Sequence, residues 1–168
     1  AIKIATELID KFGEKYEEKW LGMMRKKLGL SGVENEDKFL ILDLLTWMHQ
    51  KKLDYTNTFC HLMNIKIDKN KNFEDLDFQN WKKRWQDRLQ INKKIPEKNI
   101  ELMKSVNPLI IPRNHKVEEA LEMAEKSDFN SVNQLIEVLK KPYSQQKNIL
   151  EYQLTSNFNE NYQTFCGT

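Results

Sequence analysis

Glycine, proline, cysteine and histidine are all scarce in this sequence. Its 168 residues include five Gly, four Pro, two Cys and three His. The low Gly and Pro content excludes a collagen-like or loop-dominated chain and leaves long stretches in which a helix can continue. The alternation of apolar and polar residues that marks strands is nearly absent, whereas Lys, Glu, Leu and Ile recur with helical spacing. These features predict an all-α fold.

Long apolar runs and a large excess of one charge are also missing. No apolar run approaches the roughly 18 residues that a membrane-spanning helix needs, and the first residues do not have the layout of a signal peptide. The net charge is +2, and the charges alternate in sign along the expected helices, unlike a nucleic-acid-binding surface. Cys60 and Cys166 make no disulfide framework and suit a reducing compartment. We therefore expect a soluble cytoplasmic protein with neither a membrane nor a nucleic acid as its partner.

Helical periodicity runs through most of the chain. In the first expected helix, large side chains recur every fourth residue from Ile4 to Met24 and form one stripe, and Gly29 should end this helix. Residues 37–50 are apolar at nearly every position, which predicts the central and most buried helix. Asp54 or Thr56 could cap the next. About seven helices are expected: 2–27, 37–50 and 54–63, followed by helices that contain 78–89, 96–103, 117–124 and 132–139.

Apolar residues become sparse from Tyr143 onward. The sequence therefore predicts a compact helical domain over residues 1–142 and an irregular, extended tail over residues 143–168. The four tryptophans, which lie on helical stripes, should belong to the core. The polar loop 68–72 is the only candidate for an internal linker.

Residues that could carry chemistry are few. Cys60 and His61 are adjacent, but neighbours on a helix point about 100° apart and cannot grip one metal ion together, which favours a buried thiol and a surface imidazole. The paired acidic residues lie on charged, solvated faces. Glycine-rich loops, a Gly-Lys-Ser/Thr run, an Asp-Phe-Gly triplet and a serine nucleophile elbow are all absent. The sequence thus predicts no catalytic, cofactor-binding or metal-binding residue in this chain.

The segment Ile111 to His115, IPRNH, concentrates polar groups just before an expected helix. Asn114 or His115 could supply contacts to the first turn, and Arg113 could hold a carboxylate or a phosphate. The simpler interpretation is a turn fixed by proline that starts the helix, with Arg113 bridging to another element.

Several spaced motifs together resemble the C-terminal part of the selenoprotein O family, also called YdiU. In chain order they cover almost the whole sequence: Tyr16, Trp20, Met23 and Met24 ahead of KKLGL (26–30), DYT (54–56) with Phe59, Trp81 and Trp85 ahead of Arg88 and Leu89, NPLIIPRNHKVEEAL (107–121), PY (142–143) and the terminal TFCGT (164–168). Residues 144–160 match no motif.

The resemblance implies a pseudokinase protein adenylyltransferase. Family members have a kinase-like fold, bind ATP and a divalent metal such as Mg²⁺, and transfer AMP to hydroxyl side chains of proteins. The resemblance places their nucleotide-binding and catalytic residues upstream of this part, so none is carried onto this chain. It also places a redox residue third from the C-terminus, where Cys166 lies, and in bacterial relatives this residue is implicated in a disulfide with the catalytic part.

These observations lead to three hypotheses about the function. The first is a non-catalytic C-terminal lobe that presents Cys166 for redox control. Its helices from Ile2 to Lys140 would pack on the upstream kinase-like domain, and Arg113, Asn114 and His115 would form a structural turn facing that domain. The second is a helical interaction module that recruits protein partners. The third, an autonomous thiol oxidoreductase, is disfavoured because Cys166 has no second cysteine nearby.

Overall fold

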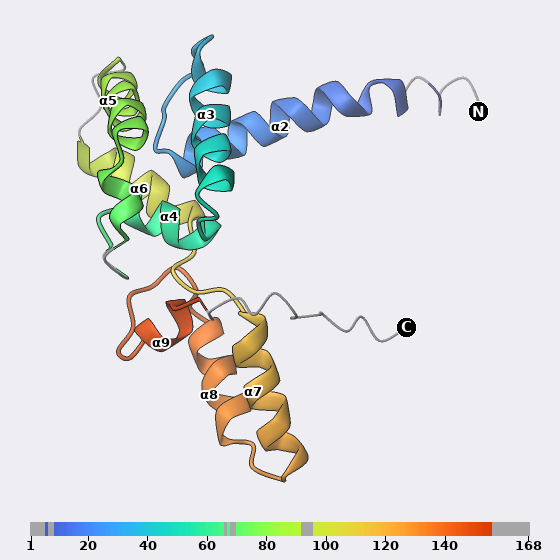
Figure 1. Ribbon diagram of the computed structural model, residues 1–168. Coiled ribbons are helices and arrows are strands. Elements are labelled where there is room, and N and C mark those ends of the chain that lie inside the picture. Colours follow the sequence, from blue (N-terminus) through green and yellow to red (C-terminus); the bar gives the residue numbers. More distant parts are fainter. Residues whose placement is uncertain (1–5, 7–8, 66, 68–69, 92–95, 156–168) are drawn as a thin grey trace. The chain divides into compact units, whose positions relative to one another are not determined.

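The computed structural model describes residues 6, 9–65, 67, 70–91 and 96–155. Every regular element among these residues is helical, which confirms the all-α prediction. In chain order the elements are α2 (Phe12–Lys27), α3 (Asp37–Gln50), α4 (Tyr55–Leu62), the short 3₁₀ helix η1 (Lys71–Glu74), α5 (Leu76–Gln90), α6 (Pro96–Val106), α7 (Asn114–Glu125), α8 (Asn130–Leu139) and α9 (Leu150–Gln153) (Figure 1). None of the described helices has the length and apolar character that crossing a membrane requires.

The chain forms two compact units, residues 1–107 and 108–168. We call them the N-terminal and the C-terminal unit. The predicted boundary after residue 142 falls within the C-terminal unit, where residues 150–153 form α9. That division stays a prediction, because residues 156–168 lie outside the described residues.

Helix α2 ends at a glycine, as its sequence predicts. Gly29 has a φ of +70°, its N–H donates to the carbonyl of Lys26, and the N–H of Leu30 donates to that of Arg25 at 2.9 Å, the two bonds of a Schellman cap. A Cβ at Gly29 would lie 2.9 Å from the carbonyl oxygen of Asn99. Glycine is therefore required both by the backbone angle and by the close approach of α6.

Helix α3 has the predicted bounds and supplies six buried residues to the N-terminal unit. Its remaining surface is less covered than the apolar sequence suggests, because Phe39 and Leu42 are exposed. The three predicted core tryptophans of α3 and α5 are buried, whereas Trp20 on α2 is only half-buried.

Aromatic side chains fill the space between α3 and α5. The rings of Trp81 and Trp85 stack with their centroids 5.8 Å apart. Their indole N–H groups donate to the carbonyl oxygens of Leu40 and Leu28, each at 2.8 Å. These bonds satisfy polar groups that would otherwise be buried without partners, and they fix α5 against α3 and against the end of α2.

Helix α4 begins at a predicted cap, since Oδ1 of Asp54 accepts a hydrogen bond from the N–H of Asn57 at 2.8 Å. Cys60 on this helix is fully buried, as expected. His61 is not the surface residue that the sequence predicted. It is half-buried, and its ring stacks on Phe73 of η1 at a centroid distance of 3.6 Å, because η1 begins at the end of the predicted linker and covers this face of α4.

Helices α7 and α8 form a hairpin in the C-terminal unit. The N–H of Leu109 donates to the carbonyl of Pro142 at 2.7 Å, and the buried amide of Gln153 donates to the carbonyl of Leu109 at 3.0 Å. The apolar pattern of residues 132–139 suggests that Leu135 and Ile136 both point inward, but Leu135 is buried and Ile136 is exposed. The small core of this unit covers only a narrow part of α8.

Candidate functional site

The three residues singled out before α7 lie together at its start. Arg113 occupies the capping position with extended backbone angles, φ −78° and ψ 132°, and α7 begins at Asn114. The carbonyl of Arg113 accepts hydrogen bonds from the N–H groups of Lys116 and Val117 at 2.9 and 3.0 Å. The side chain of Arg113 makes no capping hydrogen bond, and Asn114 and His115 occupy the first two positions of the helix.

The imidazole of His115 lies in a positively charged setting. Partial burial lowers its pKa below the ordinary value, and the charges of Lys116 and Arg113 lower it further, while Glu119 and Glu118 oppose this shift. These effects favour the neutral form of the ring. A role of Arg113, Asn114 and His115 toward another domain stays a prediction.

A buried ion cluster in the N-terminal unit is the most strongly polar feature of the described chain. Asp37, the first residue of α3, is fully buried. Its carboxylate accepts hydrogen bonds from Nε of Arg25 and Nε of Arg88, both at 2.6 Å, and from Nη2 of Arg88 at 3.2 Å. The backbone N–H of Glu34 adds a fourth bond at 3.0 Å. One carboxylate therefore ties together α2, α3, α5 and the loop before α3.

The hydrogen bonds decide the ionisation state of Asp37. Burial by itself favours the neutral acid, but the hydrogen bonds from Arg88, Glu34 and Arg25 outweigh burial and hold the pKa of Asp37 below its usual range. The guanidinium of Arg88 also donates to the carbonyl of Ser31 at 3.2 Å. Because the guanidinium of Arg88 and the carboxylate of Asp37 bond to each other and to neighbouring groups of the chain, the cluster holds helices together.

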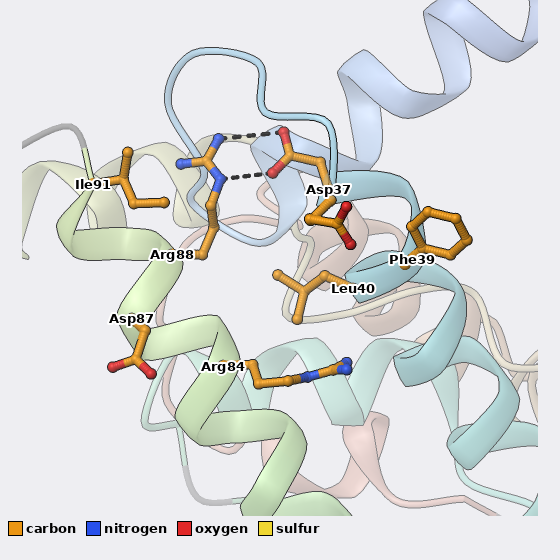
Figure 2. Close-up of a pocket in the computed structure, with 8 residues that line it drawn as sticks. Asp37, Phe39, Leu40, Arg84, Asp87, Arg88 and Ile91 are labelled. Atoms are coloured by element: carbon orange, nitrogen blue, oxygen red, sulfur yellow. Dashed lines mark hydrogen bonds and ion pairs between the residues drawn. The ribbon is translucent and has the colours of Figure 1, made fainter.

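A cavity of about 400 Å³ lies beside this cluster, between α3 and α5. Figure 2 shows the paired Asp37 and Arg88 at one end, with Leu40 and Ile91 along the walls. Arg84, which also lines the cavity, pairs with Asp43 on α3. The carboxylate of Asp37 and both guanidinium groups are thus engaged. Glu36 and Asp87 also line the cavity, and its lining contains no Ser, Thr, Cys, Lys or His that could act as a nucleophile.

A second polar link joins α2 to the end of α6. Nζ of Lys27 donates to Oδ1 of Asn107 at 2.9 Å, and the amide of Asn107 donates back to the carbonyl of Lys27 at 2.8 Å. The ammonium also lies 4.8 Å from the ring centroid of Phe59. Burial lowers the pKa of Lys27, and Cys60 has a smaller, opposing effect. This asparagine is the first residue of the longest motif, and its role here is structural.

The structure leaves the cysteine prediction open. Cys166 lies outside the described residues, and Cys60 is buried. Among residues 6, 9–65, 67, 70–91 and 96–155, no group of three or more His, Cys, Asp or Glu side chains is close enough to hold a metal ion.

Sequence reasoning missed the ion cluster, although one signal for it was present. Arg88 follows Trp85 by three residues and Trp81 by seven, which places it on the apolar stripe of α5. A charged residue on a buried stripe requires a partner. The sequence gives no comparable indication that Asp37 is that partner, since Asp37 lies 51 residues away.

Comparison with known proteins agrees with the motifs. Residues 2–140 match the family described as Protein adenylyltransferase SelO. The chain is 50% identical over 169 residues to a protein of Pelagibacter ubique named protein nucleotidyltransferase YdiU, and 44% identical over 170 residues to the protein of the same name from Alcanivorax borkumensis. A third relative with this name, from Clostridium botulinum, is also 44% identical.

Each of these alignments covers the whole of this chain but only 35% of the relative. The chain therefore spans about a third of the length of the curated relatives it matches, and corresponds to their C-terminal portion. Since the family match extends over most of the sequence, the chain belongs to the SelO family of protein adenylyltransferases.

Proposed function

We propose that this chain is the helical C-terminal lobe of a protein adenylyltransferase and supports a kinase-like catalytic domain in the rest of the protein. The observation that carries the proposal is the coverage: all of this chain matches one third of proteins named as nucleotidyltransferases. Its most polar cluster, at Asp37, serves to join helices, which fits a supporting role.

In the proposed reaction the full-length protein uses ATP and Mg²⁺. A hydroxyl oxygen of a protein substrate attacks the α-phosphorus of ATP, the bond to the β-phosphate oxygen breaks, and pyrophosphate leaves while the hydroxyl loses its proton. The substrate retains AMP. ATP, metal and substrate all belong to the catalytic domain in this proposal, and this chain contributes stability and control.

Labelled ATP tests the assignment. The full-length protein, a truncation that lacks residues 1–168 and this chain alone are each incubated with Mg²⁺ and ATP labelled on either the α- or the γ-phosphate. We expect the full-length protein to transfer the α-label only. The truncated protein should transfer less of this label or be less stable. Transfer of the γ-label would indicate a phosphotransferase. Unchanged α-label transfer by the truncated protein, or transfer by this chain alone, would contradict the supporting role.

We further propose that Cys166 controls activity by forming a reversible disulfide with a cysteine of the catalytic domain. A thiol exchanges with a disulfide more readily when it is accessible, and the resemblance to the family implies a redox residue at this position. In the full-length protein, Cys166→Ser should abolish the difference in AMP transfer between oxidised and reduced samples. The buried Cys60 provides the matched control, since Cys60→Ala should keep that difference. An unchanged redox response in Cys166→Ser would refute this part of the proposal alone.

The alternative function is a helical module that recruits protein partners. One observation favours it: the hairpin of α7 and α8 leaves Leu121, Phe129 and Ile136 exposed. Under this alternative, Leu121→Ser with Ile136→Ser should raise the KM for a protein substrate and leave kcat unchanged. The supporting role predicts no effect on KM from these two changes.

A further inference from the structure

An apolar stripe begins at Ile9, just before α2, and continues along α2, and the described residues of this unit leave it exposed. Ile9, Phe12, Tyr16 and Met23 recur at helical spacing and have exposed fractions of 73%, 68%, 61% and 44%. Phe12 and Tyr16 stack on each other with ring centroids 6.2 Å apart. We call these four residues the α2 stripe. In Figure 1 the N-terminal part of α2 extends away from α3, α4, α5 and α6.

The C-terminal half of the same helix is firmly packed. Met24 and Leu28 are buried, Arg25 is bonded to Asp37, and Gly29 closes the helix against α6. A single helix therefore contributes residues of its C-terminal half to the core of its unit and leaves Phe12, Tyr16 and Met23 exposed on another face. Contiguous apolar surface of this kind marks an interaction site.

The first part of α2 has little local stabilisation, because its ion pair with α3, between Lys38 and Glu17, is about half exposed and contributes little. A free helical segment shorter than about 12 to 15 residues is marginal in water, and only the 13 residues from Phe12 to Met24 precede Arg25 in α2. Contacts on the stripe would supply the missing packing energy. The flanking residues carry both signs of charge, Lys15 and Lys19 beside Glu14 and Glu18, so the surroundings select an apolar partner surface and no strongly charged one.

We infer that the α2 stripe docks onto the part of the same polypeptide that corresponds to the two thirds of the relatives outside the match. This inference rests on the proposed function, because it takes that part to be a folded catalytic domain. The relatives have nearly twice as much chain outside the matched region as within it. A covalently linked surface acts at a high effective concentration, which favours it over a second copy of the protein as the occupant.

Radical footprinting of the full-length wild-type protein tests the inference without any substitution. Phenylalanine, tyrosine and methionine side chains all react with hydroxyl radicals, and mass spectrometry reads each site separately. We expect Phe12, Tyr16 and Met23 to react at least about tenfold more slowly in the native protein than in the urea-unfolded protein, with the buried Phe59 as the protected reference. Rates within about twofold of the unfolded protein would overturn the inference.

Dilution identifies the occupant. Protection that persists at every concentration, in a protein that sediments as a monomer, supports docking within one chain. Protection that disappears on dilution, in step with the dissociation of a dimer, would assign the stripe to a second copy and overturn the inference.

A pair of double variants provides an independent readout. Phe12→Ser with Tyr16→Ser removes the stripe, whereas Lys15→Ser with Glu18→Ser makes the same two replacements at exposed positions elsewhere on the helix and leaves the net charge unchanged. In the full-length protein the first variant should lower the thermal midpoint by at least about 4 °C relative to the second. Equal midpoints would contradict docking.

AMP transfer is measured on the same samples. A protected stripe in a protein that transfers no AMP would refute the proposed function and leave the docking surface standing. An exposed stripe in a protein that does transfer AMP would refute the docking inference and leave the proposed function standing.

Discussion

Replacing Asp37 by asparagine should destabilise the N-terminal unit more than any surface change of the same kind. The substitution keeps the shape of the side chain, so that no cavity forms, but removes its charge. Arg25 and Arg88, with side-chain exposed fractions of 14% and 7%, would then share a buried neutral amide. The amide nitrogen would also face N–H donors of the guanidinium groups, so at least one existing hydrogen bond is lost.

The structure gives the magnitude. Removing one partner from a buried ion pair costs about 3 to 5 kcal/mol, because the remaining charge is left buried and uncompensated. Asp43 on the same helix is the matched control, since its pair with Arg84 is about half exposed on both sides. Loss of an exposed pair costs about 0 to 1 kcal/mol. Asp37→Asn should therefore exceed Asp43→Asn by several kcal/mol.

Urea unfolding followed by tryptophan fluorescence is a suitable assay. All four tryptophans lie in residues 1–107, so the signal reports the N-terminal unit alone. With a denaturant slope of about 1 to 3 kcal/mol per molar urea, the midpoint should fall by about 1 M or more in Asp37→Asn and by much less in Asp43→Asn. Equal midpoints in the two variants would refute the assignment of Asp37 as the tie between helices.

The pH dependence gives a second check. The pKa of Asp37 is lower in the folded chain than in the unfolded chain, where it is about 3.9. Its contribution to stability is therefore complete above about pH 4 and is lost as the pH falls through the lower, folded value. The difference in stability between wild type and Asp37→Asn should narrow in acid. A difference that stays constant below about pH 3 would contradict the shift.

Three further predictions concern single positions. Gly29→Ala should destabilise the N-terminal unit by at least about 1 to 2 kcal/mol because of its positive φ. Gly22→Ala, inside α2 and with open space around the new methyl group, should instead stabilise this unit by about 0.5 to 1 kcal/mol. Urea midpoints that move in the same direction in the two variants would contradict this. Asn107→Ala should cost about 1 to 3 kcal/mol in the same assay, since it removes both hydrogen bonds to α2, and a neutral result would exclude the link. Acidification from about pH 7.5 to about pH 5.5 should weaken the C-terminal unit, because the lowered pKa of His115 lets the unfolded chain bind the proton more readily; amide exchange in α7 should respond less to pH in His115→Gln, and an identical response would contradict the shift.

Periodicity predicted the helices well because each is set by local rules. The bounds of α3 follow from its continuous apolar run, the start of α6 at Pro96 follows from the preference of proline for a first turn, and the end of α2 follows from Gly29. These signals lie within a few residues of the feature that they determine. They therefore survive whatever tertiary contacts form later.

The exposed faces could not be predicted in the same way. Ile136 and Phe39 are apolar residues at helical spacing, yet both are exposed. Whether an apolar residue is covered depends on which other elements reach it, and that is determined by contacts distant in sequence. The pairing of Asp37 with Arg88 has the same origin, since neither local sequence specifies its partner. The role proposed for Cys166 is tested by neither approach, because Cys166 lies outside the described residues.

The contacts that hold the C-terminal end of α2 also fix the orientation of the α2 stripe. The helix is bonded to Asp37 through Arg25 and to Asn107 through Lys27, and the N–H of Trp85 reaches the carbonyl of Leu28 at its end. These contacts fix the direction of the helix before any partner binds. Stacked aromatic rings such as Phe12 and Tyr16 have few rotatable bonds, so little side-chain entropy is lost when they are covered. Pre-ordered aromatic residues on this helix can therefore be covered at a low entropic cost.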